Sequence, residues 1–191
     1  MTLRASTLLA AVLILAGCAT TDPSITVIHR IPHGSTVAVV MFSDCQIADQ
    51  ASCDGSGLAA GSIFVRVLAQ KPGMHAVSLP RPVGAKAPLS DGAAVAYAKA
   101  KGYRYVMNGE VQDYYQTGHL ALHANRAGIS VRVLNTSNGQ AVVTYTYQER
   151  SKTHLTSPDD MLEDMAKQLA FSMDADSKRL HQGNFIFYKG S

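Results

Sequence analysis

Pairs of histidines and carboxylates are the first candidates for chemistry in this sequence. His119 and His123 are four residues apart, which places them on one face of a strand or a helix and suggests a metal site. Two ligands are too few for zinc, and no third histidine, cysteine or acid stands at a suitable spacing. We therefore interpret them as solvated loop residues. Glu110 and Asp113 would fall on opposite faces of a regular strand, which argues against a paired acid and base.

Longer catalytic motifs are also missing from the sequence. It contains no G-x-S-x-G, P-loop or H-E-x-x-H pattern. The turn Gly55-Ser56-Gly57 precedes a predicted helix and its free amides could hold an anion, although such a turn is more often only a turn. We predict that the protein is not an enzyme, and that it has no catalytic residue, no metal site and no cofactor.

The amino-terminal stretch predicts export. A single charged side chain, Arg4, precedes an apolar run over residues 8–15, and the run ends in Leu15-Ala16-Gly17-Cys18. The run is well short of the roughly 20 residues that a membrane-spanning helix needs. Small residues before the cysteine are typical of a cleavage site, so residues 1–17 are predicted to be a signal peptide. An ordinary signal peptide followed by an incidental cysteine is the alternative.

This stretch resembles the lipobox of bacterial lipoproteins. The resemblance implies a diacylglyceryl group on the Cys18 sulfur, cleavage before Cys18 and acylation of the freed amine, for example by palmitate. One acyl chain binds a membrane with a constant of only roughly 10⁴ M⁻¹, so two or three chains are needed for a lasting anchor. Residues 18–24 are predicted to be a lipidated tether. Position 19 is Ala and not the Asp that commonly retains Gram-negative lipoproteins at the inner membrane, which implies the outer membrane, facing the periplasm.

Cys45 and Cys53 are the two cysteines that remain. The periplasm is oxidising, and the turn-rich residues between them can bring their Cα atoms within disulfide range. We predict a disulfide, and the chain-entropy model assigns about 2.5 kcal/mol to so small a loop. Free thiols and a metal-binding pair are the alternatives.

The composition excludes some classes of partner. The formal net charge is only +3, and no Lys/Arg-rich face is evident, so nucleic acid is not expected to bind. Tryptophan is absent and aromatic residues make up 7% of the chain, which disfavours carbohydrate and quaternary-amine sites.

Hydrophobic patterns predict both strands and helices. An apolar run at 37–42 indicates a strand buried on both faces, and alternating residues over 103–115 indicate a strand with one helix-packed and one solvated face. Asn138-Gly139 predicts a hairpin turn. Further predicted strands are an edge strand at 25–31, a strand at 74–79, and the hairpin strands 129–133 and 143–147. Predicted helices begin near Ala60, at Ala93 after a Ser90 or Asp91 cap, and at Pro158 after Ser157.

The last predicted helix carries an apolar stripe. Met161, Met165, Leu169 and Met173 recur every four residues, as expected for a core-facing side. A methionine-rich groove for a partner is the alternative.

The order of these elements predicts a single α/β (α+β) domain over residues 25–191, with helices packed on one mixed β-sheet. Segments 36–40, 102–111 and 133–143 resemble proteobacterial lipoproteins with an uncharacterised domain. More distantly, they resemble the curli-pore lipoproteins, the penicillin-binding-protein activator lipoproteins and the amino-terminal domain of TolB. The resemblance covers about residues 35–175 and implies recruitment or assembly at the envelope.

The function expected from the sequence is a non-catalytic interaction or assembly factor, anchored at the outer membrane, with an unidentified envelope protein as partner. A periplasmic binder of a small ligand or lipid is the main alternative, and a hydrolase whose site is dispersed through the sequence is the other. The partner surface is expected on the 45–53 loop or the proline-rich 80–89 loop, because loops this long inside a compact domain are often functional. The competing interpretation is that both loops only protect the ends of the sheet.

Overall fold

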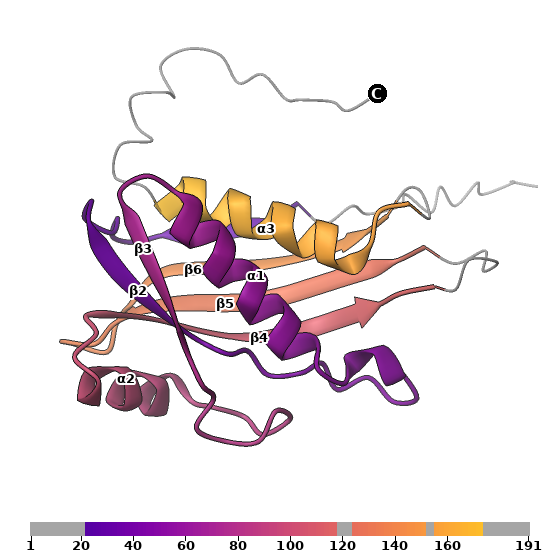
Figure 1. Ribbon diagram of the computed structural model, residues 1–191, viewed down its shortest axis with the longest axis horizontal. Coiled ribbons are helices and arrows are strands. Elements are labelled where there is room, and N and C mark those ends of the chain that lie inside the picture. Colours follow the sequence, from indigo (N-terminus) through magenta and orange to yellow (C-terminus); the bar gives the residue numbers. More distant parts are fainter. Residues whose placement is uncertain (1–21, 118–123, 152–154, 174–191) are drawn as a thin grey trace, which may run out of the picture.

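The computed structural model describes residues 22–117, 124–151 and 155–173. In this part of the chain, three α-helices pack on a mixed six-stranded sheet, as predicted (Figure 1). The strands are β1 (Ser24–Val27), β2 (Ser35–Val40), β3 (Met74–Leu79), β4 (Tyr105–Tyr115), β5 (Arg126–Asn135) and β6 (Ala141–Arg150). The helices are α1 (Ser56–Gln70), α2 (Asp91–Ala100) and α3 (Pro158–Met173), with a short 3-10 turn, η1 (Ala51–Cys53). None of the described helices is long and apolar enough to cross a membrane.

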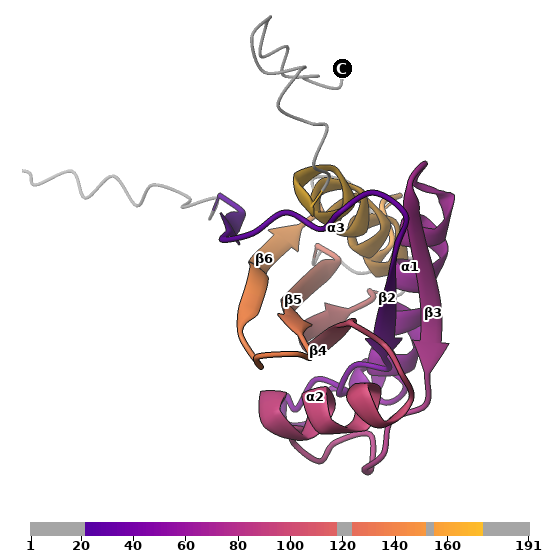
Figure 2. The same cartoon turned by 90° about the vertical axis from the view of Figure 1, so that its left-hand side faces the viewer.

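The strands lie in the order β1-β6-β5-β4-β2-β3. β2 runs parallel to both β3 and β4, whereas the β4–β5, β5–β6 and β6–β1 pairs are antiparallel. Figure 2 shows α1 and α3 on one face of the sheet and α2 on the other. We call these the inner face and the outer face.

β2 has a helix over each of its faces, which explains its continuous apolar run. Val37 and Val39 point into the core beneath α1 and α3, while Ala38 and Val40 point into the smaller core beneath α2. All four are fully buried. A strand covered in this way needs no polar side, so it does not alternate.

The inner face is closed by α1 and α3. Met161, Met165, Leu169 and Met173 are at most 1% exposed, which confirms the core interpretation of the stripe and not the groove. The Phe64 ring of α1 packs edge-on against Phe42, with 5.2 Å between the ring centroids. Burying each side chain of this size stabilises the fold by about 1.5–3 kcal/mol.

The outer face is only partly solvated, and here the prediction for the longest strand was incomplete. Its first half is buried under α2, because Val106 packs there and the Asn108 amide donates to the Leu89 carbonyl and to Asp91, both at 3.0 Å. Asn108, a polar residue in the alternating pattern of β4, is therefore buried and hydrogen-bonded and not exposed to solvent. Beyond Asn108 no helix covers the outer face of β4 among the described residues.

Several element boundaries differ from the predicted ones. β1 ends at Val27, because the Ile28 and His29 amides both donate to the Val142 carbonyl and so leave the ladder. The hairpin strands extend beyond the predicted segments at both ends. Their turn is at the predicted place, with Gly139 at φ +73°.

Candidate functional site

The predicted disulfide is present. Cys45 and Cys53 are bonded, their Cα atoms are 5.0 Å apart, and both side chains are buried. The bond closes a loop that leads from the end of β2 through η1 to the start of α1.

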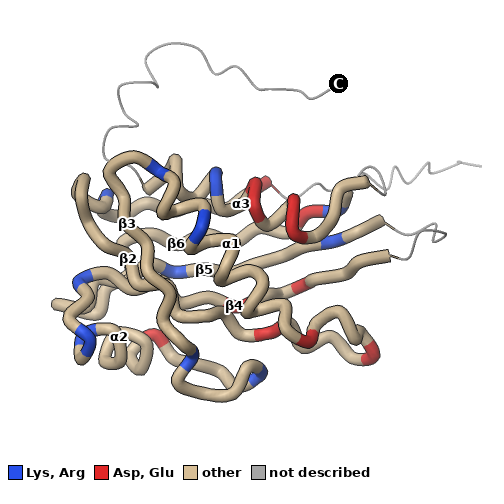
Figure 3. The backbone as a smooth tube through the Cα atoms, in the orientation of Figure 1, with Lys and Arg blue, Asp and Glu red and all other residues tan. Residues whose placement is uncertain are grey.

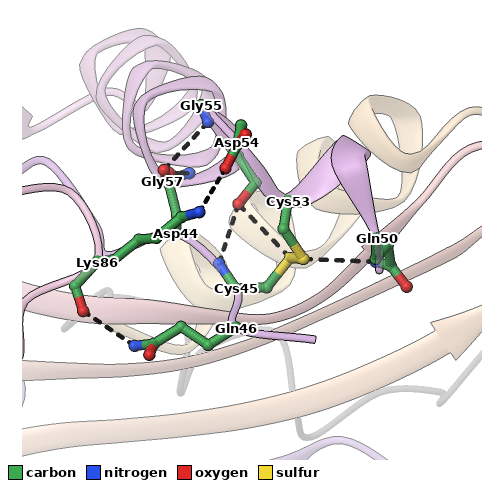
Figure 4. Close-up of polar contacts among 10 residues, drawn as sticks. Asp44, Cys45, Gln46, Gln50, Cys53, Asp54, Gly55, Gly57 and Lys86 are labelled. Carbon is green, nitrogen blue, oxygen red and sulfur yellow. Dashed lines mark hydrogen bonds and ion pairs between the residues drawn. A yellow bond between two sulfur atoms is a disulfide. The ribbon is translucent and has the colours of Figure 1, made fainter. Parts of the chain in front are cut away.

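Asp44 occupies the glycine turn at the start of α1. Its carboxylate accepts hydrogen bonds from the Gly55 amide at 3.1 Å and the Gly57 amide at 2.7 Å, and the residue is only 6% exposed (Figure 4). The Ser56 hydroxyl accepts from the Cys45 amide at 3.1 Å. A carboxylate here is favoured by the positive end of the helix dipole. The anion that this turn could hold is therefore supplied by the chain itself.

Gly57 is required by close contact with the end of β2. A Cβ atom at this position would collide with the Phe42 carbonyl oxygen and with the backbone of Ser43. Only glycine allows α1 to begin this close to the backbone, which brings the Gly57 amide to Asp44.

Arg81 organises the second long loop, residues 80–89. Its guanidinium donates to three carbonyls, those of Met41 at 3.2 Å, Gly84 at 3.3 Å and Ala87 at 2.5 Å. Burial lowers the pKa of Arg81 from its usual value, and the nearby Asp44 carboxylate opposes this shift. A side chain thus supplies the hydrogen bonds that a strand or helix would otherwise give to this loop.

The two loops are joined to each other. The Asp44 amide donates to the Ala85 carbonyl and the Gln46 amide side chain donates to the Lys86 carbonyl, both at 2.9 Å. Lys86 also forms a 2.7 Å ion pair with Asp54. We call residues 44–57 and 80–89 together the double loop, because the two candidate partner surfaces form one continuous structure (Figure 4).

The other side of the double loop is attached to β4. The Gln50 side-chain amide donates to the Tyr114 carbonyl at 3.0 Å, and the Ser52 hydroxyl donates to the same carbonyl at 2.6 Å. Two aliphatic side chains of the double loop stay at the surface, since Ile47 and Val83 are each 38% exposed. The double loop therefore presents apolar side chains on a backbone that is held from both sides.

A pocket of about 430 Å³ lies between the double loop, α2 and the outer face of β4 and β5. Its floor carries Arg132, which is paired with Asp91 at 3.1 Å, and Glu110. The lining mixes charged, polar and apolar side chains: Ser43, Arg81, Val83, Pro88, Leu89, Ser90, Ala93, Asn108, Glu110, Ser130 and Arg132. Its volume lies within the range of about 300–1,000 Å³ usual for ligand pockets, but its lining is more polar than a lipid site would be.

The carboxylates considered from the sequence lie differently from the prediction. A β-bulge falls between Val111 and Asp113, and Asp113 pairs with Gly128 while Glu110 pairs with Ser130. Residues two apart on β5 share a face, so Glu110 and Asp113 also share a face, and the prediction of opposite faces was wrong. Asp113 forms an ion pair with Arg126 at 2.9 Å, which gives it a structural role.

Other candidates lie outside the described residues, namely Cys18, His119, His123 and the signal peptide 1–17. Within the described residues, no group of three or more potential metal ligands comes together. In Figure 3 Asp and Glu lie mostly toward the start of α3 and the end of β4, and Lys and Arg mostly toward α2 and β3, with some of each sign at both ends.

Sequence reasoning missed the residues that build the double loop. Asp44, Gln50 and Arg81 act on backbone groups far away in the chain, and no spacing rule links such partners. The glycines at 55 and 57 were the one available signal, because free amides at a helix start need an acceptor.

The fold defines an α+β class with one mixed sheet, and its relatives are distant. No protein-family model and no curated protein matches the sequence. Among solved structures, the chain is similar to the dodecamer of a PelC variant from Paraburkholderia phytofirmans, with 18% identity and a TM-score of 0.62 over 81% of this chain and 100% of that one. A second PelC dodecamer from the same organism has 18% identity and a TM-score of 0.59, over 77% of this chain and 93% of that one.

TolB from Acinetobacter baumannii is also similar, with 14% identity and a TM-score of 0.40, over 79% of this chain and 31% of TolB. Lipoprotein GNA1162 from Neisseria meningitidis matches with 13% identity and a TM-score of 0.41, over 78% of this chain and 99% of that one. The solved structures similar to this chain thus include TolB and a lipoprotein, both of which the predicted resemblance named.

Proposed function

We propose that this protein is a lipoprotein of the Gram-negative outer membrane, anchored through Cys18 on the periplasmic face, which binds an envelope protein and catalyses no reaction. The observation that carries this proposal is the double loop. Its two segments lie about 40 residues apart in the sequence, and a 2.9 Å hydrogen bond joins Gln46 of one to Lys86 of the other. The segments are held to each other without strand pairing between them. Ordering such a structure costs conformational entropy. Once ordered, it can present side chains to a partner in fixed positions.

Rigidity favours binding because less entropy is lost when the loop is captured. The double loop is held by a disulfide, by the Asp44 carboxylate and by the three hydrogen bonds of Arg81. Ile47 and Val83 would supply apolar anchors, and the Lys86–Asp54 pair would lie near them in the polar rim that surrounds such anchors.

The distant structures support a role in assembly. PelC, with the same fold, forms a dodecamer in both crystal forms. In the present chain the two edge strands, β1 and β3, contain no Lys, Arg, Asp, Glu or Pro, the residues that commonly block pairing with another strand. Further copies of this chain are therefore candidates for part of the assembly.

The double loop is tested by photocrosslinking in intact cells. A photoreactive phenylalanine analogue at Ile47 or Val83 should capture a discrete protein, while the same analogue at Arg66 or Gln70, on the exposed side of α1, should not. Capture only from the α1 positions would place the partner elsewhere and defeat the assignment. The size and identity of the product distinguish a second copy of this chain from another envelope protein.

The lipid anchor is tested separately. Cys18→Ser should release a folded protein from the membrane fraction, because the anchor and the domain are joined only by a tether. A variant that stays with the outer membrane in high salt would contradict anchoring through Cys18 alone.

The second candidate function is binding of a small polar ligand, and the pocket of about 430 Å³ favours it. The Glu110 carboxylate is suited to accept a hydrogen bond from a ligand, since it makes no hydrogen bond or ion pair with any residue the structure describes. Native mass spectrometry of protein extracted from membranes would show a bound molecule that Glu110→Gln reduces. A mass equal to that of the unliganded protein would argue against this candidate.

A further inference from the structure

Three side chains form a row across β4, β5 and β6 at the end of the sheet. Tyr115 pairs with Arg126, and Arg126 pairs with Arg150. Directly paired residues on neighbouring strands point to the same face. We call Tyr115, Arg126 and Arg150 the arginine row. The end of β4, the start of β5 and the end of β6 lie together at one end of the sheet (Figure 1).

Only one of the two guanidinium groups in the arginine row is paired with a carboxylate. Two arginines directly opposite each other destabilise a sheet unless they are neutralised. Arg126 is neutralised by Asp113 at 2.9 Å, and its guanidinium lies 4.8 Å from the centre of the Tyr115 ring. The Arg150 guanidinium makes no hydrogen bond or ion pair with any residue the structure describes. The adjoining segments 118–123 and 152–154 contain no Asp or Glu in their sequence.

The arginine row also borders a hollow. A pocket of about 340 Å³ is lined by Tyr115, Ala124, Arg126 and Arg150. Guanidinium groups match phosphate oxygens with two parallel hydrogen bonds, and a tyrosine beside them is typical of a water–lipid boundary. The chemistry of this hollow therefore suits a phosphate that is attached to a larger molecule.

The first described residues lie toward this same end. β1 is antiparallel to β6, with Ser24 opposite Thr146 and Val27 opposite Val143. Asp22, two residues before Ser24, is close enough to Tyr147 of β6 to interact with it electrostatically. Cys18 lies six residues before Ser24, and six extended residues span at most about 20 Å. A lipid on Cys18 thus keeps the membrane within reach of this end of the sheet.

From this juxtaposition we propose that the arginine row binds the phosphate of an anionic phospholipid head group in the leaflet that holds the anchor. The inference rests on the proposed lipidation of Cys18, which it extends from attachment to orientation. The anchor limits the distance to the membrane, and the arginine row selects which end of the sheet faces it. The outer face and the double loop are then held at a fixed angle to the bilayer.

A lipid is a better occupant than an acidic protein for a geometric reason. The tether is too short to let another protein of ordinary size lie between the end of the sheet and the bilayer, since about 20 Å is less than the diameter of a small domain. The head-group layer is also always present there, at high local concentration.

The test uses the mature chain, residues 18–191, with Cys18→Ser, so that neither the acyl anchor nor the apolar signal peptide hides the weaker contact. Flotation with vesicles of phosphatidylethanolamine containing about 30 mol% phosphatidylglycerol is compared with flotation on phosphatidylcholine alone. We expect binding to the anionic vesicles that falls in about 0.5 M salt. A surface arginine contributes about 1 kcal/mol to such binding, so Arg150→Gln should weaken it about fivefold.

Arg132→Gln is the matched control, because Arg132 lies on the same face of β5, six residues from Arg126, at the other end of the strand. It should leave binding unchanged. Equal loss in both variants, or no loss in Arg150→Gln, would overturn the proposal. Thermal melting of each variant excludes misfolding as the cause.

The result is distinguishable from failure of the anchor itself. Mass spectrometry of the wild-type amino-terminal peptide reports whether Cys18 carries lipid, independently of the vesicle assay. Binding of inorganic phosphate at about 10 mM to the Cys18→Ser protein, without any binding to the anionic vesicles, would identify a free-anion site and overturn the head-group assignment.

Discussion

The two faces of the sheet differ in how far helices cover them. The inner face is covered along its length by α1 and α3, and its core side chains are apolar. The outer face is covered only near α2, and elsewhere it exposes polar and charged side chains such as Ser130, Arg132 and Thr146. The larger apolar core therefore lies on the inner face, and the smaller one lies beneath α2 on the outer face. Substitutions can test how sharp this division is.

The largest effect is expected on the inner face. Leu169→Ala removes a fully buried side chain of α3 and should lower the free energy of unfolding by about 2–5 kcal/mol. Thr144→Ala, on the outer face of β6, should cost less than about 1 kcal/mol. Urea unfolding of both variants checks the difference. Similar losses would show that the outer face contributes to stability as much as the inner face does.

The disulfide comes next. Replacing Cys45 and Cys53 together by Ala should cost about 2.5 kcal/mol, because the open loop gains freedom in the unfolded chain. Non-reduced, denatured wild-type protein should show no alkylated cysteine at these positions by mass spectrometry. Two alkylated thiols there would mean that the bond does not form in the cell.

Asp44→Asn tests the connection between the double loop and α1. Removing the charge weakens the bonds to the Gly55 and Gly57 amides and the interaction with the helix dipole, so we expect a loss of about 1–2 kcal/mol. Asp49→Asn is the control, because Asp49 already has φ +59°, which Asn tolerates equally well. Chemical denaturation of the two variants should separate them. A loss in the control as large as in Asp44→Asn would point to net charge instead.

The smallest effect concerns the start of α3. Asp160 accepts hydrogen bonds from the Ser157 amide and hydroxyl, and these lower the pKa of Asp160 below its usual value. A depressed carboxylate pKa stabilises the fold at neutral pH, and this contribution is lost as the pH falls through the folded-state pKa. Ser157→Ala should cost about 1 kcal/mol at about pH 7 and less at about pH 2.5. Thermal unfolding at both pH values measures it, and an equal loss at both would contradict the assignment.

The sequence predicted the sheet, the three helices and the disulfide because each depends on local signals. The apolar run of β2, the Asn138-Gly139 turn and the cap at Ser157 all act within a few residues of themselves. The parts it did not predict depend on distant contacts. The burial of Asn108 requires α2, the irregularity at Gln112 appears only in the pairing with β5, and the double loop depends on side chains that reach across the fold.

The double loop and the arginine row could likewise be predicted from the sequence only in part. Loop length correctly indicated both segments of the double loop as unusual, but not that Gln46, Asp54 and Lys86 join them. The arginine row could not be seen in the sequence at all, because Arg126 and Arg150 become neighbours only through the register of the hairpin.

The short spacing of the two bonded cysteines also has a consequence for the order in which the bond and the fold form. Contact between the ends of a loop of about ten residues forms within roughly 10–100 ns, far faster than a domain folds around its sheet. The thiols of Cys45 and Cys53 therefore meet repeatedly in the unfolded chain, before Tyr114 has become available to Gln50 and Ser52. The bond can thus be introduced into an otherwise unstructured polypeptide, so oxidation does not have to wait for the native state. If the chain is exported and lipidated at Cys18 as proposed, a periplasm that lacks its thiol oxidant should accumulate a slowly maturing form of it, and not a misbridged one.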